Sequence, residues 1–283
     1  MNLLDEFGQY FELVKANSPR LLGEVHWLRK QVFEIEHQFE PHKSAIDENI
    51  IDPYEHRSVS CLLNHRRSGH AAATVRLVLP ASADKNYWFP AEDLFENQLI
   101  QSGFEIPQHY RETTAELSRL AVSKRFRNRP GEAQVSHGMA TTNHPLESIP
   151  SENQRRRHPF IILGLLRGAI QLSKENGIKH WLAVMDPALL RALRYFGMDF
   201  YRVCQPKEYH SSQRVLCWND LDQILTGVKK IRPDVYRFLD SEGFDEPAEP
   251  DFIMPTSVPR ADHKAPELYS AEFFQRRRWE NRQ

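Results

Sequence analysis

Three charged side chains interrupt apolar stretches of the sequence that otherwise have the character of buried strands. Arg76 lies within TVRLVLP, and Glu116 and Arg119 lie within TAELSRLAV. Burying an ionised side chain is costly unless it is paired or has a function. In a cleft, such residues can hold a charged substrate and move a proton. These three residues are therefore candidates for a functional site.

Three more charged residues complete a set of opposite charges. Arg29 precedes Phe33 by about one turn of the first predicted helix, so the two side chains share a face, and Asp52 and Glu55 stand in the segment DPYE. Together with the strand residues they give three cations and three anions, and we expect one compensated buried network that lines a cleft. DPYE is also a good helix-capping pattern, with Asp52 as the N-cap and Glu55 three residues later, and both roles can coexist.

The spacing of Glu116 and Arg119 sets a geometric condition. Residues three apart on a regular strand face opposite sides of the sheet, so these two side chains would not share a site. A β-bulge between them would bring both to one side, and bulges cluster beside active sites. We therefore predict an irregularity between Leu117 and Ala121.

The elements that must position these residues alternate between helices and strands. An antiparallel start followed by strand–helix–strand alternation predicts an α/β fold with a mixed central sheet flanked by helices. Apolar periodicity predicts helices at roughly 13–39, 92–101, 158–176, 187–196 and 219–229. Short apolar runs between turn signals predict strands at 58–64, 71–79, 114–122, 178–185, 200–203 and 214–218, the first two as a hairpin.

Local signals mark where these helices begin and end. Ser18-Pro19 and Asp186-Pro187 each place a capping side chain before a proline suited to the first turn. Gly177 and Gly197 follow the last apolar residues of their helices, where a left-handed residue closes a helix.

The chain is expected to form one main domain with a tail. We assign residues 1–240 to the domain and expect 130–157 to be a mobile insertion, because that stretch has no hydrophobic period. Residues 241–283 contain five prolines and mixed charge, and we expect a C-terminal extension that is partly disordered or wraps the surface.

Composition excludes several classes of protein. The 37 Lys and Arg residues nearly balance the 38 Asp and Glu residues, which gives no general case for a nucleic-acid or anionic-membrane partner. Three cysteines without CxxC spacing and histidines without HExxH spacing predict neither a disulfide framework nor a metal site. No apolar run is long enough to span a bilayer, and residues 1–10 lack the basic start of a signal peptide, so we expect a cytoplasmic protein.

Four blocks of the sequence, in order and approximate spacing, resemble those of the acyl-homoserine-lactone autoinducer synthases: LRKQVF, DPYE, VRLVLP and ELSRLAVS. They resemble still more closely the long-chain N-acyl amino acid synthases, and above all the branch called PEP-CTERM/exosortase system-associated acyltransferases. The resemblance covers roughly residues 21–225 and includes HPFIILGLLRGAI, HWLAVMDPALLRAL, YFGMDF and KEYH. It implies a GNAT-type acyltransferase fold and transfer of an acyl chain from a carrier-protein or coenzyme A thioester to an amine, with no bound cofactor.

The resemblance also assigns roles to residues. Two departures matter: Ile50 and Ser60 stand where the family often has a second acidic residue and a histidine, and Phe39 replaces an aromatic residue that is Trp in the autoinducer synthases. These departures disfavour an S-adenosylmethionine acceptor and favour an amino acid. By resemblance Glu116 and Arg119 are catalytic, and the substrate-binding residues are Arg29, Phe33, Asp52, Glu55, Arg76 and Ser118.

Aminolysis of a thioester requires a neutral amine, whereas the amine of an amino acid is mostly protonated at neutral pH. Glu116 is our candidate for the general base that removes the proton, because burial on a strand would raise its pKa. Backbone N–H groups beside the same strand would stabilise the oxyanion. Arg29, Arg76 or Arg119 could hold the carboxylate of the acceptor, and the fatty chain would need an apolar channel.

The turn after the central strand differs from an ordinary phosphate-binding loop. KRFRNRPGE contains one glycine, Gly131, and is rich in arginine instead. A basic rim suits an acidic acyl carrier protein, which we expect to be the partner that delivers the acyl group on its phosphopantetheine arm. The expected carrier-binding residues are Arg125, Arg127, Arg129, Arg155, Arg156 and Arg157.

Three other functions stay open on sequence alone. They are an acyl-homoserine-lactone synthase, a short-chain acetyltransferase that uses coenzyme A, and a catalytically inactive module that binds an acyl chain or a carrier protein. The arginine-rich turn disfavours the second, and the presence of both Glu116 and Arg119 disfavours the third.

Overall fold

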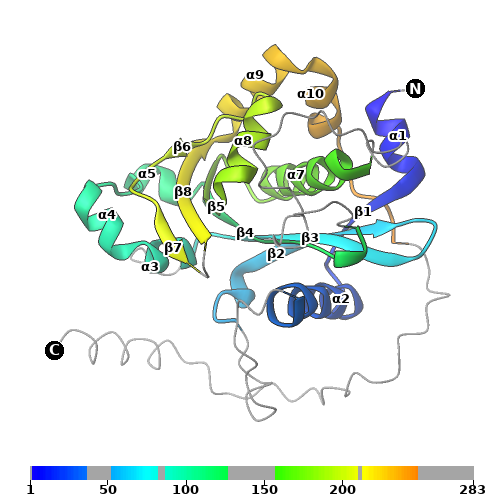
Figure 1. The fold of residues 1–283 in the computed structure, drawn as a ribbon, viewed down its shortest axis with the longest axis horizontal. Coiled ribbons are helices and arrows are strands. Elements are labelled where there is room, and N and C mark those ends of the chain that lie inside the picture. Colours follow the sequence, from blue (N-terminus) through cyan, green and yellow to red (C-terminus); the bar gives the residue numbers. More distant parts are fainter. Residues whose placement is uncertain (1, 37–51, 82–86, 127–156, 210–211, 248–283) are drawn as a thin grey trace, which may run out of the picture. The chain divides into compact units, whose positions relative to one another are not determined.

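The computed structural model describes residues 2–36, 52–81, 87–126, 157–209 and 212–247 of the chain. In that part of the chain one mixed sheet dominates, with the strand order β1-β2-β3-β4-β5-β8-β6 and with β7 also paired to β8 (Figure 1). Neighbouring strands are antiparallel except β4 and β5, which are parallel. The strands are β1 (Phe11–Lys15), β2 (Ser58–His65), β3 (His70–Val78), β4 (Thr114–Val122), β5 (His180–Met185), β6 (Tyr201–Arg202), β7 (Lys207–Tyr209) and β8 (Ser212–Asp220).

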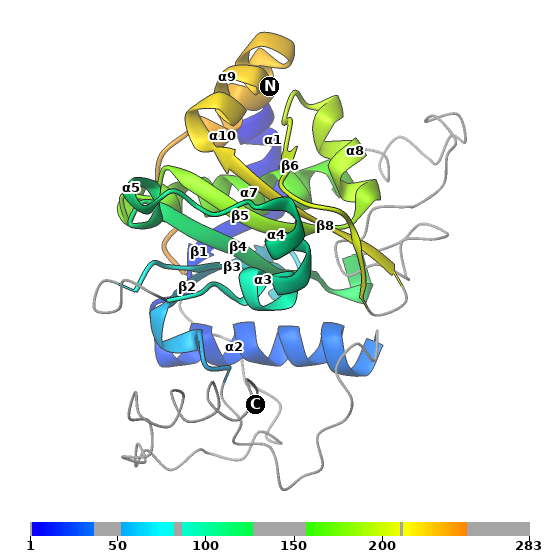
Figure 2. The ribbon, with the colours of Figure 1, turned by 90° about the vertical axis from the view of Figure 1, so that its left-hand side faces the viewer.

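Helices cover both faces of the sheet (Figures 1 and 2). We call the face that α7 covers the back face and the opposite one the front face. The back face carries α1 (Leu3–Tyr10), α7 (Arg157–Glu175), α8 (Pro187–Tyr195), α9 (Leu221–Ile231) and α10 (Pro233–Asp240). The front face carries α2 (Pro19–Lys30), α3 (Pro90–Leu94), α4 (Glu96–Ser102) and α5 (Gln108–Arg111). The prediction of a mixed central sheet flanked by helices is confirmed.

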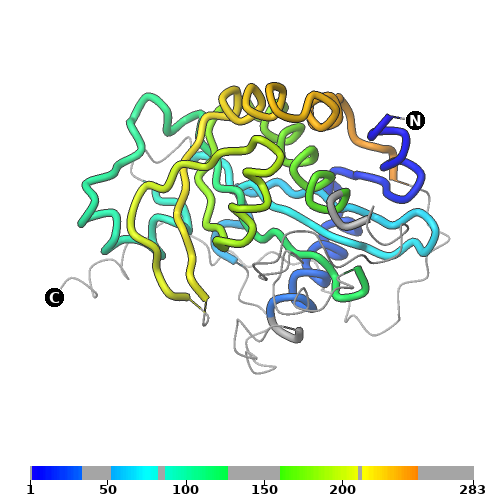
Figure 3. Tube along the Cα trace, turned by 45° about the horizontal axis from the view of Figure 1, so that its top comes forward, coloured from blue at the N-terminus to red at the C-terminus, as the bar shows by residue number. Residues whose placement is uncertain are grey.

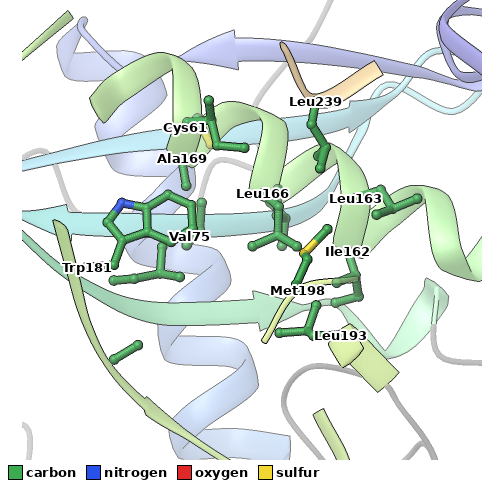
Figure 4. Packing of buried hydrophobic residues seen from close by; sticks show 14 of the residues in the cluster. Cys61, Val75, Ile162, Leu163, Leu166, Ala169, Trp181, Leu193, Met198 and Leu239 are labelled. Atoms are coloured by element: carbon green, nitrogen blue, oxygen red, sulfur yellow. The ribbon is translucent and has the colours of Figure 1, made fainter. Parts of the chain in front are cut away.

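The largest core lies between the sheet and α7. The apolar run in α7 is buried on every side because the helix packs against strands below it and against α1 and α10 beside it. A Cβ atom at Gly168 would come 2.4 Å from the sulfur of Cys61, so only glycine allows this close approach of helix to strand. Figure 4 shows Cys61, Val75, Leu166 and Trp181 in this core, and the indole N–H of Trp181 donates to Ser173 Oγ at 2.9 Å.

The two ends of the described domain meet. Figure 3 shows α1 beside α10, although they stand at opposite ends of the domain sequence. The rings of Phe7 and Phe238 pack edge to face with centroids 5.0 Å apart. Asp245 then binds the free edge of β1, where its N–H donates to Leu13 O and the Leu13 N–H donates to its carboxylate, both at 2.8 Å.

The predicted helix boundaries at caps and glycines are confirmed. Asp186 accepts from the Ala188 N–H at 2.7 Å at the start of α8. Gly177 and Gly197 have φ values of 66° and 84°, the left-handed conformation expected just after α7 and α8. The β2–β3 hairpin and β4 also lie where the apolar runs predicted them.

Other predictions were wrong. The helix predicted at 13–39 begins only at Pro19, because Phe11–Lys15 form β1, a strand whose first four residues are buried and whose apolar side chains merged with the helical pattern. From Gln31 to Glu36 the helix continues as a π-helix, and residues 37–51 lie outside the described part. The sequence interpretation also missed α1, α5, β7 and α10, and it treated α3 and α4 as one helix.

Two predictions of the domain limits fall largely outside the described residues. α7 begins at Arg157, and residues 130–156 of the expected insertion are not described. The same holds for 248–283 of the expected extension. Among the described residues, no helix combines the length and the apolar character that crossing a bilayer would require.

Candidate active site

A β-bulge in β4 shapes the centre of the front face. Ser118 pairs with Arg76 of β3, but Ala121 pairs with Thr74, so three steps along β4 match two steps along β3. Arg119 lies at this bulge and has a φ of 52°, a backbone conformation that is rare outside glycine. The bulge brings Arg119 to the face that Ser118 already occupies. The predicted irregularity between Leu117 and Ala121 is confirmed.

The DPYE turn supplies two carboxylates to this face. Asp52 Oδ1 accepts the Tyr54 N–H at 3.0 Å and so caps its own turn. Its other oxygen, Oδ2, accepts from Arg76 at 2.6 Å and from Arg119 at 3.3 Å. Glu55 turns toward Arg29 and Arg76 rather than back along the chain. Asp52 therefore combines a local turn contact with its ion pairs, but the predicted helix cap is not formed, because the short 3-10 helix begins at Glu55 with Tyr54 as its N-cap and Glu55 is engaged by the arginines.

Two arginines are buried at the base of the site. The Arg76 side chain is 2% exposed and donates from Nε to Ser118 Oγ at 3.1 Å and from Nη1 to Asp52 and to Glu55 Oε2, the latter at 3.1 Å. Arg29 donates to both oxygens of Glu55 at 3.1 and 3.2 Å and to Ser60 Oγ at 2.6 Å. Burial lowers the pKa of Arg29 to about 10, so it stays charged at neutral pH.

We call Arg29, Asp52, Glu55, Arg76 and Arg119 the ion-pair cluster. Burial alone would raise the pKa of Glu55, but a hydrogen bond with His26 and the charges of Arg29 and Arg76 outweigh it and lower the pKa to about 2. Burial opposes ionisation of Asp52 as well, yet Arg76, the Tyr54 N–H and Arg119 hold its pKa below the ordinary value. Both carboxylates are ionised at neutral pH.

Arg119 is the most accessible of the three arginines, with 31% of its side chain exposed. Its guanidinium lies over the ring of Phe33, 5.5 Å from the centroid, and one Nη contacts Asp52. Phe33 belongs to the π-helix that continues α2, and it packs against a smaller cluster of buried apolar residues between α2 and the sheet. Two residues that the sequence predicted separately for the site, Phe33 of the first helix and Arg119 of the central strand, are thus in contact.

Glu116 lies on the same face, two residues before Ser118, and is 4% exposed. Its Oε2 accepts the N–H of Ala91 at the start of α3, at 2.7 Å. Burial is the largest influence on its pKa and raises it to about 7, although the Ala91 N–H and the charges of Arg76 and Arg57 lower it. At neutral pH a carboxyl group with this pKa can both accept and release a proton, which suits a general base.

The sheet opens beside this carboxyl group. β4 and β5 pair from Thr114 and His180 as far as Leu117 and Ala183, and β4 then continues to Val122 without β5 as a partner. Ser118, Arg119 and Leu120 are partly exposed along this stretch. The two parallel strands therefore diverge next to the bulge, and backbone groups of β4 there are not used by pairing with β5.

Several contacts at the site were not predicted. Ser60 was noted only as a departure from the family pattern, yet it is buried and accepts from Arg29, and it stands opposite Arg76 in the hairpin register. His26 Nε2 lies 3.0 Å from Glu55 Oε1. The hairpin register and the helical spacing of His26 from Arg29 were the signals in the sequence that could have identified them.

Some predicted site residues cannot be placed in this arrangement. Arg125 is exposed in the short 3-10 helix Lys124–Phe126 that follows β4. The side chains of Arg127, Arg129, Arg155, Arg156 and Arg157 lie outside the described residues. The carrier-binding rim therefore stays a prediction.

The apolar channel also stays a prediction. One cavity of about 500 Å³ lies between α4 and residues 202–206, and another of about 430 Å³ lies where residues 197–201 approach α9. Residues of the ion-pair cluster line neither of them. Among the described residues, no group of three or more His, Cys, Asp or Glu side chains is placed to hold a metal ion.

A family model described as an acetyltransferase (GNAT) domain matches residues 28–137, the range that holds the whole ion-pair cluster and Glu116. The chain is an acyltransferase with the GNAT fold. None of the curated protein sequences compared with this acyltransferase matches it.

Solved structures similar to this acyltransferase include BjaI and TofI. BjaI, a coenzyme A-dependent acyl-homoserine lactone synthase with SAM and isopentyl-CoA, is 15% identical, with a TM-score of 0.52 over 80% of this chain and 89% of that one. TofI, in a ternary complex with an inhibitor and MTA, is 16% identical, with a TM-score of 0.50 over 80% and 99%. FeeM, an N-acyl amino acid synthase from uncultured soil microbes, is 9% identical, with a TM-score of 0.49 over 78% and 97%. At these identities the likeness to BjaI and TofI is one of fold.

Proposed function

We propose that the protein moves a long-chain acyl group from a thioester on an acyl carrier protein, or on coenzyme A, to the amine of an amino acid or a related acceptor. The observation that carries this proposal is the position of Glu116: a buried carboxyl group with a pKa of about 7, on the strand that diverges from β5 and on the face that bears Arg119. An ordinary structural ion pair would leave the carboxyl group ionised at much lower pH.

The chemistry proceeds in one transfer. Glu116 takes a proton from the acceptor's ammonium group, directly or through a water, and the neutral amine attacks the thioester carbonyl carbon. Backbone N–H groups of β4 beside the bulge stabilise the oxyanion of the tetrahedral intermediate. The C–N bond forms, and as the C–S bond breaks the proton that the nitrogen loses passes to the departing thiolate, while Glu116 returns the proton it took to the solvent. No covalent bond to the enzyme is needed.

We assign different roles to the arginines of the ion-pair cluster: two support the site, and one contacts the substrate. Arg29 and Arg76 are buried and direct their N–H groups to Glu55, Asp52 and serine hydroxyls, so they hold the walls of the site in place. Arg119 is the most exposed arginine of the cluster, and we assign it to the acceptor carboxylate, with Phe33 as the surface behind it. Asp52, Glu55 and Ser118 complete the proposed binding surface by fixing these arginines.

The charge of the cluster favours an anionic or zwitterionic acceptor. Among the described residues, three arginines face the ionised carboxylates of Asp52 and Glu55, and Glu116 adds less than a full negative charge at neutral pH. A sulfonium acceptor such as S-adenosylmethionine would bring positive charge to a surface that is already positive. An acyl-homoserine-lactone synthase is therefore the second candidate, and release of methylthioadenosine would identify it.

The donor and its carrier follow from the resemblance and from charge. We propose that Arg125, Arg127, Arg129 and the run Arg155 to Arg157 bind an acidic acyl carrier protein in the cytoplasm. Charge reversal of the run 155–157 should weaken carrier binding in a salt-dependent way, and unchanged binding would remove this part of the proposal. The link to exosortase systems is tested by whether the gene lies among genes of such a system.

The proposed function is tested by mass spectrometry of lipids from cells that express the protein. Cells with the natural protein should accumulate an N-acyl amino acid, which names both substrates, and cells with Glu116→Gln should not. The amide introduced by Glu116→Gln keeps an oxygen that can accept the Ala91 N–H, so the fold should persist. Equal lipid profiles in cells with and without the natural protein would overturn the proposal.

A further inference from the structure

Arg57 occupies an unusual setting at the rim of the site, at the end of the short 3-10 helix Glu55–Arg57. Its guanidinium lies 5.3 Å from the ring centroid of Tyr54, 5.0 Å from that of Tyr87 and 5.3 Å from that of Phe89. It also donates to the carbonyl of Trp88 at 2.7 Å and to the carbonyl of Leu79. An arginine held by three rings and two carbonyls is fixed in both place and orientation.

These contacts join the end of β3 to the segment that leads into α3. Arg111 holds the other side of that segment, because it donates to Tyr87 O at 3.0 Å and to the carboxylate of Glu92 at 2.6 and 3.2 Å. Glu92 in turn accepts the Phe89 N–H at 2.9 Å. The segment is thus fixed at Tyr87, Trp88 and Phe89, immediately before Ala91.

Ala91 is the residue whose N–H binds Glu116. A movement of the segment by a few tenths of an ångström would lengthen that 2.7 Å hydrogen bond and weaken it. Arg57 therefore acts on Glu116 in two ways: through the backbone that it holds, and through its positive charge close to the carboxylate.

We propose that Arg57 is a positioning residue for acyl transfer, which fixes the Ala91 N–H against Glu116 and favours the ionised form of the base. The inference rests on the proposed function of Glu116. Nothing in the sequence pattern assigned a role to Arg57, and it makes no contact with the ion-pair cluster among the hydrogen bonds described.

The groups that act on Glu116 come from three neighbouring elements. Arg76 of β3 and Arg57 favour the carboxylate, whereas Glu92 of α3 disfavours it. The pKa of Tyr54 is raised by burial, by Asp93, to which its hydroxyl donates, and to a smaller degree by the charge of Glu116. Since burial already raises the pKa of Glu116 to about 7, removal of the Arg57 charge should raise it further.

The test compares Arg57→Gln, Arg57→Lys and a matched control, Arg167→Gln. Arg167 is a close counterpart on the opposite face of the sheet, because it donates to carbonyls of Glu242 and Gly243 and lies over the ring of Phe238 at 5.8 Å. It touches neither Glu116 nor the α3 segment in the described contacts. Each variant is measured for kcat/KM against pH and for the pH titration of the Glu116 carboxyl carbon by NMR, assigned with Glu116→Gln.

The expected result is a shift that a structural role alone would not produce. In Arg57→Gln the acidic limb of the kcat/KM profile and the Glu116 titration should both move upward by about half a pH unit or more. Arg57→Lys keeps the positive charge, so the acidic limb should move less than in Arg57→Gln, while kcat falls about tenfold because the ammonium group lacks the planar fork with which arginine holds both carbonyls. Arg167→Gln should change neither the acidic limb of the kcat/KM profile, nor the titration of Glu116, nor kcat.

Contrary results are equally specific. An unmoved limb and titration in a folded Arg57→Gln protein would overturn the inference. If Arg57→Gln does not fold, the lysine variant decides: full kcat together with unchanged hydrogen exchange at the Ala91 amide would overturn it. Absence of acyl transfer by the natural protein would instead contradict the proposed function, and the NMR titration would still decide whether Arg57 acts on Glu116.

Discussion

Arg76 and Arg119 donate hydrogen bonds to the same oxygen of Asp52, at 2.6 and 3.3 Å. They come from neighbouring strands, and only the bulge at Arg119 brings them to one face of the sheet. Arg76 is almost completely buried, whereas Arg119 is partly open to solvent. One carboxylate therefore links an arginine that supports the site to an arginine that can meet a substrate.

The support provided by Arg76 should be visible in stability. Arg76→Leu leaves Asp52 and Glu55 without their shared buried partner, and loss of one member of a buried ion pair costs about 3–5 kcal/mol of unfolding free energy. Arg66→Gln at the β2–β3 hairpin, where the arginine is 40% exposed, should cost less than about 1 kcal/mol. Urea unfolding measures both, and equal costs would show that the buried network contributes no more than a surface pair.

The contact that Arg119 offers should appear in the kinetics of the acceptor. Arg119→Met should lower kcat/KM for a carboxylate-bearing acceptor about 10- to 100-fold, since a charge-assisted hydrogen-bonded pair is lost. With the corresponding amine that lacks the carboxylate, the natural protein and the variant should differ by less than about threefold. If kcat/KM of the variant falls by the same factor with both acceptors, Arg119 does not bind the carboxylate.

Glu55 should make the protein sensitive to acid. Its pKa in the folded protein is about 2, against an ordinary value of 4.5, so the stability that it contributes is present above pH 4.5 and is lost as the pH falls toward 2. Glu55→Gln should therefore be less stable than the natural protein at neutral pH and should lose less stability over that range. Thermal unfolding between pH 2 and 7 tests this, and parallel curves would contradict it.

Glu116 should have the opposite effect. Its pKa in the folded protein is about 7 instead of 4.5, so the folded state holds a proton that the unfolded state has released, and stability falls as the pH rises between these values. Glu116→Gln removes this loss. Its unfolding free energy should exceed that of the natural protein by up to about 3 kcal/mol at pH 8, and the difference should shrink toward pH 4. A difference independent of pH would contradict the raised pKa without any reference to activity.

The sequence predicted the elements that carry the site better than those that surround it. β2, β3 and β4 combine short apolar runs with turn signals, and α7 and α8 have clear caps. The bulge at Arg119 could be predicted because Glu116 and Arg119, three residues apart, could share a site only if the strand was irregular. β1 was missed because Leu13 and Val14 stand only a few residues before Pro19 and extend the apolar pattern of α2.

The parts of the site that were missed depend on tertiary contacts. Ser60 meets Arg29 across α2 and β2, and Ala91 meets Glu116 across α3 and β4, at sequence separations of 31 and 25 residues. No sequence pattern predicts such a contact for a single serine or for a backbone N–H group at the start of a helix. Arg57 lies beside the predicted DPYE turn, but its aromatic setting comes from Tyr87 and Phe89, which the sequence left in an unassigned stretch.

The most direct measurement is the pH dependence of kcat/KM for acyl transfer by the purified protein, compared with Glu116→Gln. Glu12→Gln, which alters another buried strand glutamate at the far edge of the sheet, serves as the control. The natural protein and the control should both show an acidic limb near pH 7. Glu116→Gln should lose that limb, and its rate should fall about 10²- to 10⁴-fold. Full turnover by Glu116→Gln, with the limb unchanged, would contradict the assignment of Glu116 as the base.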